Sequence, residues 1–234
     1  MGKKKYFLNH PSNQNILFLR NELHKVLAQE EFVVEFPVVN NEIIEIIENA
    51  PKASLKKVLI HNLNYNFDKF KVEKIWKINL EKDLQGISTS HKTPECAICI
   101  LQKYKNEEEI SYTLRILLIE LKSSLDNEEL KKIEDKFRYG MSRLYMLLVL
   151  NNHLNPIKGY NEEIITIDFR GILFFNNKNR LNVDDSKFYK ILHTPSSQGK
   201  LIFTTLLRGK DQLNIKCFEN INSEITIDLK DLLI

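Results

Sequence analysis

The sequence is poor in the residues that mark several classes of protein. Seven glycines and three cysteines among 234 residues exclude a collagen-like chain and a disulfide-bonded scaffold. No apolar run approaches the roughly 20 residues that a membrane helix needs, so we expect a soluble protein without a membrane partner. The first residues, MGKKKYFLNHPSNQN, have a basic start but no apolar core and no cleavage site. Together with the low cysteine content, this favours the cytoplasm.

Three catalytic motifs are also missing from the sequence. There is no glycine-rich phosphate loop, no G-x-S-x-G and no H-E-x-x-H, which argues against a nucleotide cofactor, an esterase and a zinc protease. Cys96 and Cys99 form a C-x-x-C without a second pair of zinc ligands. They lie in an apolar strand-like run, where positions three apart point to opposite faces, so we interpret both as core residues.

The composition is that of one ordinary globular domain. Hydrophobic residues make up 43% and charged residues 28% of the chain, which excludes a disordered protein. The 34 basic and 31 acidic residues give a net charge of +3. This charge permits a nucleic-acid partner without requiring one.

Hydrophobic periodicity predicts the elements of the N-terminal third. Residues 13–30 have an apolar stripe at helical spacing and are predicted to form a helix. Residues 32–39 are extended and interrupted by Pro37, and residues 41–51 are predicted to form a short helix that ends at Pro51. Alternating apolar and polar residues predict a strand over 70–80.

The rest of the chain alternates between strands and helices. Two strand-like runs, 95–104 and 110–123, are joined by KNEEE as in a hairpin. A long amphipathic helix follows over about 128–150, with Asp126 and Glu129 as a capping box. A strand over 162–175, a short helix over 182–193 and a terminal hairpin that turns at Gly209 complete the chain. The predicted fold class is α/β, with a central mixed β-sheet flanked by helices and a C-terminal β-hairpin tail.

The end of the second hairpin strand carries the most informative residues. Residues 116–119 are apolar at every position, as in a strand that is buried on both faces. Glu120 and Lys122 then share one face, while Leu121 points to the other. If the two strands pair through KNEEE, Glu95 lies opposite residues 118–121. Two carboxylates and a lysine would then converge in a site suited to magnesium.

These residues resemble those of the PD-(D/E)XK nuclease superfamily. The matching residues are Pro94-Glu95 and Glu120-Leu121-Lys122, followed by a long helix and another strand, and the resemblance covers about 70–175. It implies a restriction-endonuclease-like core that uses Mg²⁺, or Mn²⁺ in its place. Glu95, Glu120 and Leu121 would be the metal ligands, and Lys122 would position the attacking water. Glu95 departs from the family, which most often has aspartate there.

The same spacing of an acid and a lysine occurs elsewhere in the chain. Asp228-Leu229-Lys230 also ends a predicted strand, but too close to the end of the sequence for a following helix and strand. The tripeptides at 129–131, 134–136 and 185–187 lie in helical or polar stretches. The alternative interpretation of Glu120 and Lys122 is a solvated, ion-paired strand end.

The resemblance implies a single nuclease domain over 1–234, with an N-terminal helical part over 1–55 and a tail over 176–234 that reads nucleic acid or dimerises. Candidate residues for contacting nucleic acid are His91, Lys92, Arg180, Arg208 and Lys210.

The expected function is that of a homodimeric, type II restriction-like endonuclease that cleaves double-stranded DNA. Two alternatives stay open. One is an RNA- or single-strand-specific defence nuclease, and the other is a non-catalytic binding or assembly module.

Overall fold

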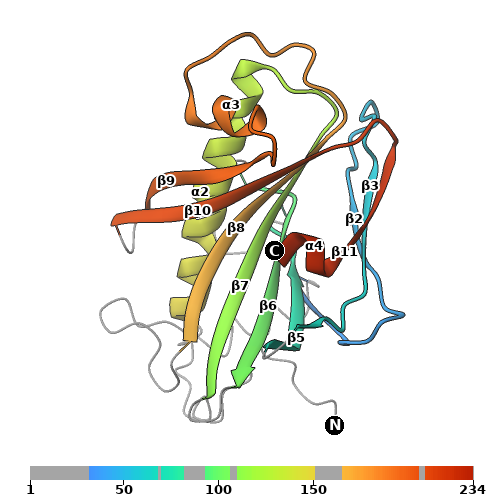
Figure 1. Cartoon of the computed structure of the whole chain (residues 1–234), viewed down its shortest axis with the longest axis vertical. Coiled ribbons are helices and arrows are strands. Elements are labelled where there is room, and N and C mark those ends of the chain that lie inside the picture. The colour runs from blue at the N-terminus through green and yellow to red at the C-terminus, as the bar shows by residue number, and fades with distance from the viewer. Residues whose placement is uncertain are drawn as a thin grey trace.

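A computed structural model describes residues 32–67, 70–81, 93–105, 110–150, 165–205 and 209–233. The helix predicted over 13–30 lies outside the described residues. The described part has a large mixed β-sheet with a long helix on one face and a small second sheet on the other (Figure 1). The chain is thus a mixed α/β protein, as predicted.

The large sheet has eight strands, and seven of them follow the order β1-β5-β6-β7-β8-β10-β9. Strand β4 pairs with β5 at the side of this path. The pairs β7–β8 and β8–β10 are parallel, and the others are antiparallel. The bounds of the strands are β1 Val33–Phe36, β4 Asn66–Phe67, β5 Phe70–Ile78, β6 Cys96–Lys105, β7 Ile110–Lys122, β8 Ile165–Phe175, β9 Gln198–Thr205 and β10 Gly209–Glu219.

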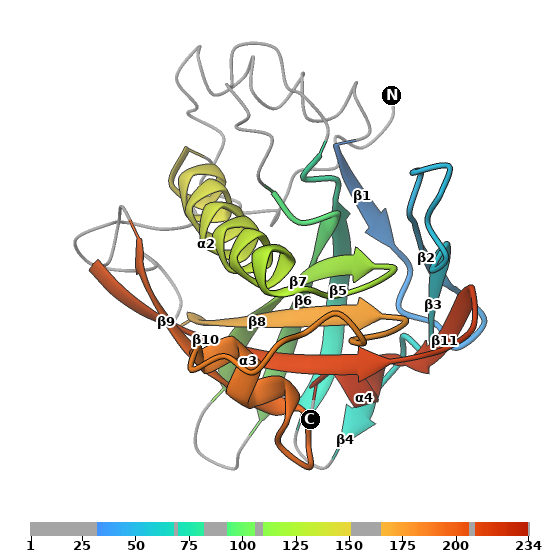
Figure 2. The same cartoon turned by 90° about the horizontal axis from the view of Figure 1, so that it is seen from above.

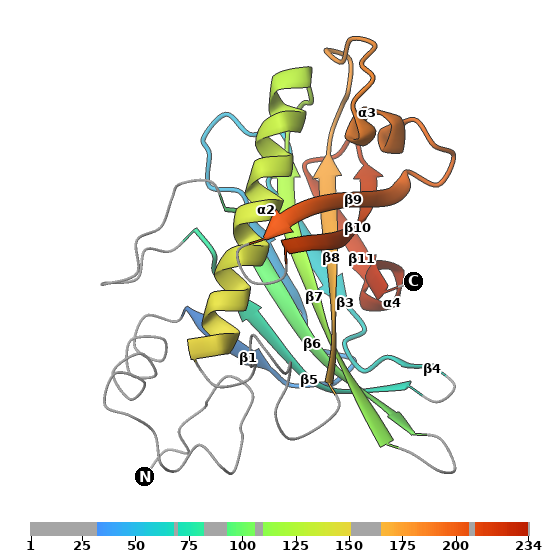
Figure 3. The ribbon, with the colours of Figure 1, turned by 90° about the vertical axis from the view of Figure 1, so that its left-hand side faces the viewer.

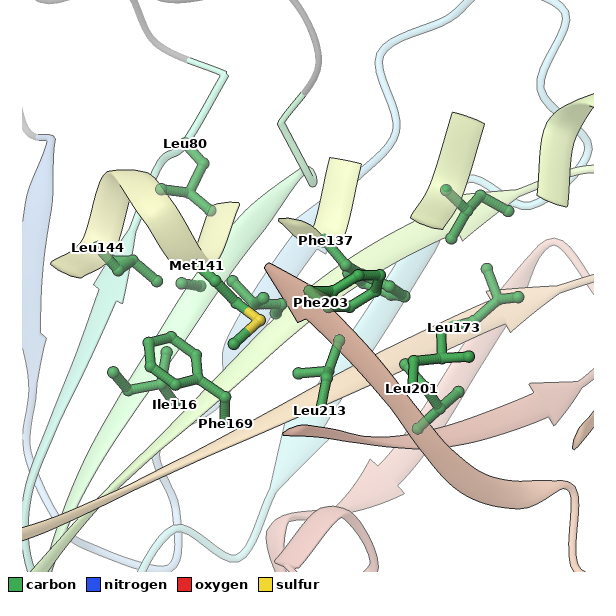
Figure 4. Close-up of a cluster of buried hydrophobic side chains, with 14 of the residues drawn as sticks. Leu80, Ile116, Phe137, Met141, Leu144, Phe169, Leu173, Leu201, Phe203 and Leu213 are labelled. Atoms are coloured by element: carbon green, nitrogen blue, oxygen red, sulfur yellow. The ribbon is translucent and has the colours of Figure 1, made fainter. Parts of the chain in front are cut away.

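Helix α2 (Asn127–Leu150) connects the parallel strands β7 and β8 and lies along one face of the sheet (Figures 2 and 3). The backbone N–H of Glu129 donates to Asp126 Oδ1 over 2.8 Å, so Asp126 caps the helix as predicted. The apolar stripe of α2 is buried against the sheet, together with side chains from β9 and β10 (Figure 4). The short helix α3 (Lys187–Leu192) adds buried side chains to the same cluster. This packing forms the first core.

The opposite face of the large sheet is covered by a three-stranded sheet and a short helix. The small sheet has the order β11-β3-β2, with β2 Ile44–Ile47, β3 Lys57–His61 and β11 Glu224–Asp228. Helix α4 (Leu229–Leu233) follows β11, and together these elements bury a second core. The central strands are therefore buried on both faces, which explains the continuous apolar run in β7. Cys96 and Cys99 are buried in different cores, as expected for core residues on opposite faces.

The prediction of a short helix over 41–51 is wrong. Ile44 and Ile46 are buried and alternate with the exposed Glu45 and Ile47, because β2 pairs with β3 over one buried face. The sequence IIEII satisfies both a helical and an alternating pattern over so few residues, and the available partner strand decides between them. The described part of the predicted N-terminal helical region consequently contains the strands β1 and β2 instead of helices.

The remaining element predictions that fall on described residues are confirmed. The β6–β7 hairpin is antiparallel, and α2 and β8 follow it as expected. The C-terminal hairpin also exists as β9 and β10, but β10 pairs with β8, so the hairpin extends the large sheet rather than forming a tail. None of the helices in the described part is long and apolar enough to span a bilayer.

Candidate functional site

The candidate site lies where β6 begins and β7 ends. Cys96 pairs with Ile119 in the antiparallel ladder, so the next pair of positions outward is Glu95 and Glu120. Ala97 and Leu118 belong to the core under α2, and side chains alternate along a strand, so both glutamates face α2. The hairpin thus brings the two carboxylates to one face of one sheet edge.

A lysine from α2 contacts both carboxylates. Lys136 Nζ lies 2.7 Å from Glu120 Oε1 and 3.8 Å from Glu95 Oε1. Lys122 Nζ also contacts Glu120 Oε1, at 3.0 Å. The Glu120 side chain has no exposed surface, and its Oε2 has no hydrogen-bond partner among the described residues. One oxygen of a fully buried carboxylate is therefore paired twice, while the other is not paired.

Lys136 is the residue of this site that sequence reasoning missed. In the sequence it is the lysine of the helical tripeptide 134–136 and lies on the polar side of α2. Its position over the glutamates depends on how the helix is rotated relative to the sheet, which the periodicity of the helix alone does not give.

The charges continue from the buried glutamates toward the surface. Lys122 Nζ lies 3.4 Å from Glu129 Oε2, and Glu129 Oε1 lies 2.7 Å from Lys132 Nζ. The exposed fraction of the lysine side chain rises from 21% at Lys122 to 60% at Lys132. The network thus runs from the buried end of β7 to solvent along the first two turns of α2.

Burial shifts the pKa values of the glutamates. Loss of solvent and the nearby charge of Glu120 raise the pKa of Glu95 to about 9, and Glu81 adds to this rise while Lys136 opposes it. Burial also raises the pKa of Glu120, against the effect of Lys136 and Lys122. Keeping both carboxylates ionised is therefore unfavourable with these two lysines alone.

Lys122 and Glu129, which continue the network beyond Glu120, behave as members of ordinary ion pairs. Burial lowers the pKa of Lys122, but the carboxylates of Glu120 and Glu129 outweigh it, and the pKa is raised overall. At Glu129 burial is outweighed by Lys132 and Lys122, which lower the pKa. Both groups are consequently charged at neutral pH.

The donor set fits a hard cation. Glu95 and Glu120 offer carboxylate oxygens, one of them unpaired and buried, and carboxylates are the ligands that Mg²⁺ prefers. The Leu121 side chain is buried in the second core, on the other face of the sheet, so only its main-chain oxygen could contribute. Within the described residues no three His, Cys, Asp or Glu side chains cluster closely enough to hold a metal by themselves.

Two of the residues predicted to contact nucleic acid, Arg180 and Lys210, lie in the described part of the chain, at opposite ends of the large sheet. His91, Lys92 and Arg208 lie outside the described residues. Arg180 is exposed, and its backbone bridges with that of Asp126, at the edge where β7 ends. Lys210 lies at the start of β10, which runs parallel to β8, and therefore at the opposite end of the sheet.

The rival tripeptide lies in a different environment. Asp228 ends β11 in the small sheet, and its side chain is 32% exposed. It accepts a hydrogen bond of 2.8 Å from Asn62 Nδ2 and lies 3.7 Å from Lys230 Nζ. No second acid within the described residues pairs with Lys230. Asp228 is thus a partly solvated strand end.

Comparison of the chain with protein-family models, with curated proteins and with solved structures finds no match. The site is therefore interpreted from its own residues.

Proposed function

We propose that this protein is a magnesium-dependent endonuclease with a restriction-endonuclease-like core, which hydrolyses phosphodiester bonds of double-stranded DNA. The observation that carries the proposal is the buried Glu120 carboxylate, which lies beside Glu95 at the end of a central strand and has one unpaired oxygen. Two buried acids with raised pKa values on one face of the sheet reduce the stability of the fold. Acids with such shifted pKa values concentrate at functional sites.

The order of the elements around the site supports the proposed core. Pro94-Glu95 directly precedes β6, Glu120-Leu121-Lys122 ends β7, α2 follows, and β8 returns parallel to β7. This is the context in which the resembling motif is expected, with a long helix and a strand after the tripeptide. The rival at Asp228 is followed by the five-residue helix α4.

Each residue of the site has a role in the proposed reaction. Glu95 and Glu120 would hold the metal, which when bound would neutralise charge on the scissile phosphate. Lys122, which contacts Glu120 and is partly exposed, would orient the attacking water through its ammonium. Lys136 holds the two carboxylates together and balances part of their charge.

The test is cleavage of supercoiled plasmid DNA with Mg²⁺ and with EDTA. Wild type should nick or linearise the plasmid only with Mg²⁺. Glu120→Ala and Lys122→Ala should each reduce the rate by roughly 10²-fold or more, the typical effect of removing an electrostatic catalytic group. Asp228→Ala is the matched control, since it changes the acid of the other strand-end tripeptide, and should cleave at the wild-type rate.

Binding to DNA without metal separates the two site residues. Glu120→Ala removes a negative charge beside the phosphate, so affinity in a gel shift should hold or rise. Lys122→Ala removes a positive charge and should weaken binding slightly. A Glu120→Ala variant that cleaves at the wild-type rate would place the active site elsewhere.

A non-catalytic binding or assembly module is the second candidate, and the pairing of Glu120 with two lysines favours it, since these ion pairs also suit a purely structural network. Absence of Mg²⁺-dependent cleavage of DNA and RNA alike would support this candidate. Cleavage of RNA or of single strands only would instead support the related nuclease activity. The homodimer is proposed by analogy with enzymes that cut both strands of a symmetric site.

A further inference from the structure

The face of the large sheet away from α2 contains a pocket with a cationic lining. The pocket has a volume of about 380 Å³ and lies among β8, β9, β10 and α4. Arg170, Lys200 and Lys216 supply three positive charges, and none of the lining residues is acidic. The candidate nuclease site lies on the other face of the same sheet, so these cations are not part of it.

Two of the cations are anchored by hydrogen bonds to the structure around the pocket. Arg170 Nε lies 3.2 Å from Asp168 Oδ2, and its Nη1 donates to the main-chain oxygen of Leu233 over 2.5 Å. Lys216 Nζ donates to the main-chain oxygen of Asp231 over 2.7 Å. A guanidinium has five N–H donors, so Arg170 can donate to a ligand besides these two partners.

The positive charges are also crowded together. Arg115 Nη1 donates to the same Leu233 oxygen as Arg170, over 2.6 Å, so two guanidinium groups meet at one carbonyl. Burial lowers the pKa of Lys216, with Asp231 opposing this and Arg170 adding to it. An anion in the pocket would relieve this repulsion between like charges.

The rest of the lining suits an organic molecule. The exposed Gln198 and the partly buried Asn214 offer amide groups that can hydrogen-bond to it, while Ile172 and Leu232 are buried beneath the pocket. The volume falls within the range of roughly 300–1,000 Å³ that small-molecule sites occupy, and is larger than a bare inorganic anion needs.

We propose that this pocket binds a small organic phosphate of nucleotide size, with the phosphoryl group held by Arg170, Lys200 and Lys216. A phosphoryl group presents three oxygens and up to two negative charges, which match three cations around one pocket better than the two oxygens of a carboxylate. The amide groups of Gln198 and Asn214 would contact the organic part of the ligand. The pocket is thus a second site, separate from the proposed nuclease site.

Calorimetric titration of the full chain tests the proposal, with EDTA present so that metal at the nuclease site does not contribute. Adenosine monophosphate is the probe, and adenosine and inorganic phosphate are the comparisons. The monophosphate should bind at least about tenfold more tightly than adenosine, because adenosine lacks the charge. It should also bind more tightly than inorganic phosphate, which lacks the organic part.

The variant Lys200→Gln locates the binding. Lys200 is exposed and makes no ion pair with any described residue, so its replacement should leave the fold intact. It should weaken binding of the monophosphate about tenfold. Lys190→Gln is the matched control: it removes the same charge from α3, outside the pocket, and should bind as wild type does.

Three outcomes would overturn the proposal. They are no saturable binding of the monophosphate at millimolar concentration, equal binding of adenosine, and equal affinities for the Lys200→Gln and Lys190→Gln variants. Glu120→Gln provides the check against the nuclease site. Unchanged binding by this variant supports a separate pocket whether or not the protein cleaves DNA, and loss of binding would overturn it.

Discussion

In the described part of the chain, two strand ends carry an acid followed two positions later by a lysine, and the two ends differ in almost every other respect. At the end of β7, Glu120 is fully buried and contacts Lys122 and Lys136. At the end of β11, Asp228 is 32% exposed and contacts Lys230 and Asn62. The spacing in sequence is the same, so the position of the strand in the fold makes the difference.

The position of each strand explains its environment. Strand β7 lies between β6 and β8 in the large sheet, and α2 covers the face that Glu120 occupies. Strand β11 is an edge strand of the small sheet. A helix that crosses a central strand end can supply a further side chain, Lys136, whereas an edge strand end remains open to water. A motif of three residues becomes a candidate site only when its strand is covered in this way.

The largest expected effect concerns the lysine that the helix supplies. Lys136→Met should lower the free energy of unfolding at neutral pH by about 3 kcal/mol, because it leaves a buried carboxylate with one ion-pair partner fewer. Lys230→Met removes a partner from the exposed pair and should lower it by less than about 1 kcal/mol. Urea denaturation of both variants measures the two values. Equal losses would show that the two strand ends do not differ in their electrostatics.

A second change in the same background should recover part of that loss. Glu120→Gln combined with Lys136→Met removes the buried charge together with its partner, so the double variant should be about 1–2 kcal/mol more stable than Lys136→Met alone. Denaturation of the wild type, both single variants and the double variant gives the coupling energy. A double variant that loses the sum of the two single losses would mean that Glu120 and Lys136 do not interact.

The pKa of Glu95 gives a prediction about pH. Its ordinary value of 4.5 is raised to about 9, so between these values the folded protein retains a proton that the unfolded chain loses. The free energy of unfolding should therefore fall as the pH rises through this window, and level off above it. Glu95→Gln mimics the protonated acid and should be more stable than wild type near pH 8 by of the order of 2 kcal/mol.

The difference between Glu95→Gln and wild type should disappear well below pH 4.5, where the acid is protonated in both states of wild type. Urea denaturation at both pH values makes the comparison. Glu35→Gln, which changes an acid on the edge strand β1, is the control and should show no comparable gain. A Glu95→Gln variant that is less stable than wild type at both pH values would contradict the assigned direction.

The hairpin, the long helix and the shared face of Glu95 and Glu120 could be predicted because local patterns encode them. Successive side chains of a strand point to opposite faces, which fixes the faces of the residues in 95–101 and 112–121, and the short KNEEE connection sets the pairing. The cap of α2 is equally local, since Asp126 and Glu129 are three residues apart.

Other features depend on contacts between distant parts of the chain. Lys136 contacts Glu120 because of the way α2 is rotated about its axis where it packs on the sheet. Strand β3 pairs in parallel with β11, which lies far away in the sequence. The helix predicted over 41–51 is wrong for a related reason. Its apolar pattern fits a helix or a strand, and pairing with β3 selects the strand. The cationic pocket likewise combines four elements that no local pattern connects.

The smallest predicted effect concerns the start of the helix that distinguishes the two strand ends. Asp126 Oδ1 accepts a hydrogen bond from the backbone N–H of Glu129, and its charge lies at the positive end of α2. Asp126→Ala should lower the free energy of unfolding by about 1 kcal/mol, and Asp126→Asn by only a few tenths, because asparagine keeps the accepting oxygen.

Since the rest of α2 still packs on the sheet, Lys136 should remain over Glu120, and both variants should cleave plasmid DNA if the wild type does. Urea denaturation orders the three proteins, and an alanine variant as stable as wild type would show that the cap does not stabilise α2. Loss of cleavage in the alanine variant alone, with only the small change in stability, would instead show that the first turn of α2 positions the Lys122–Glu129 pair.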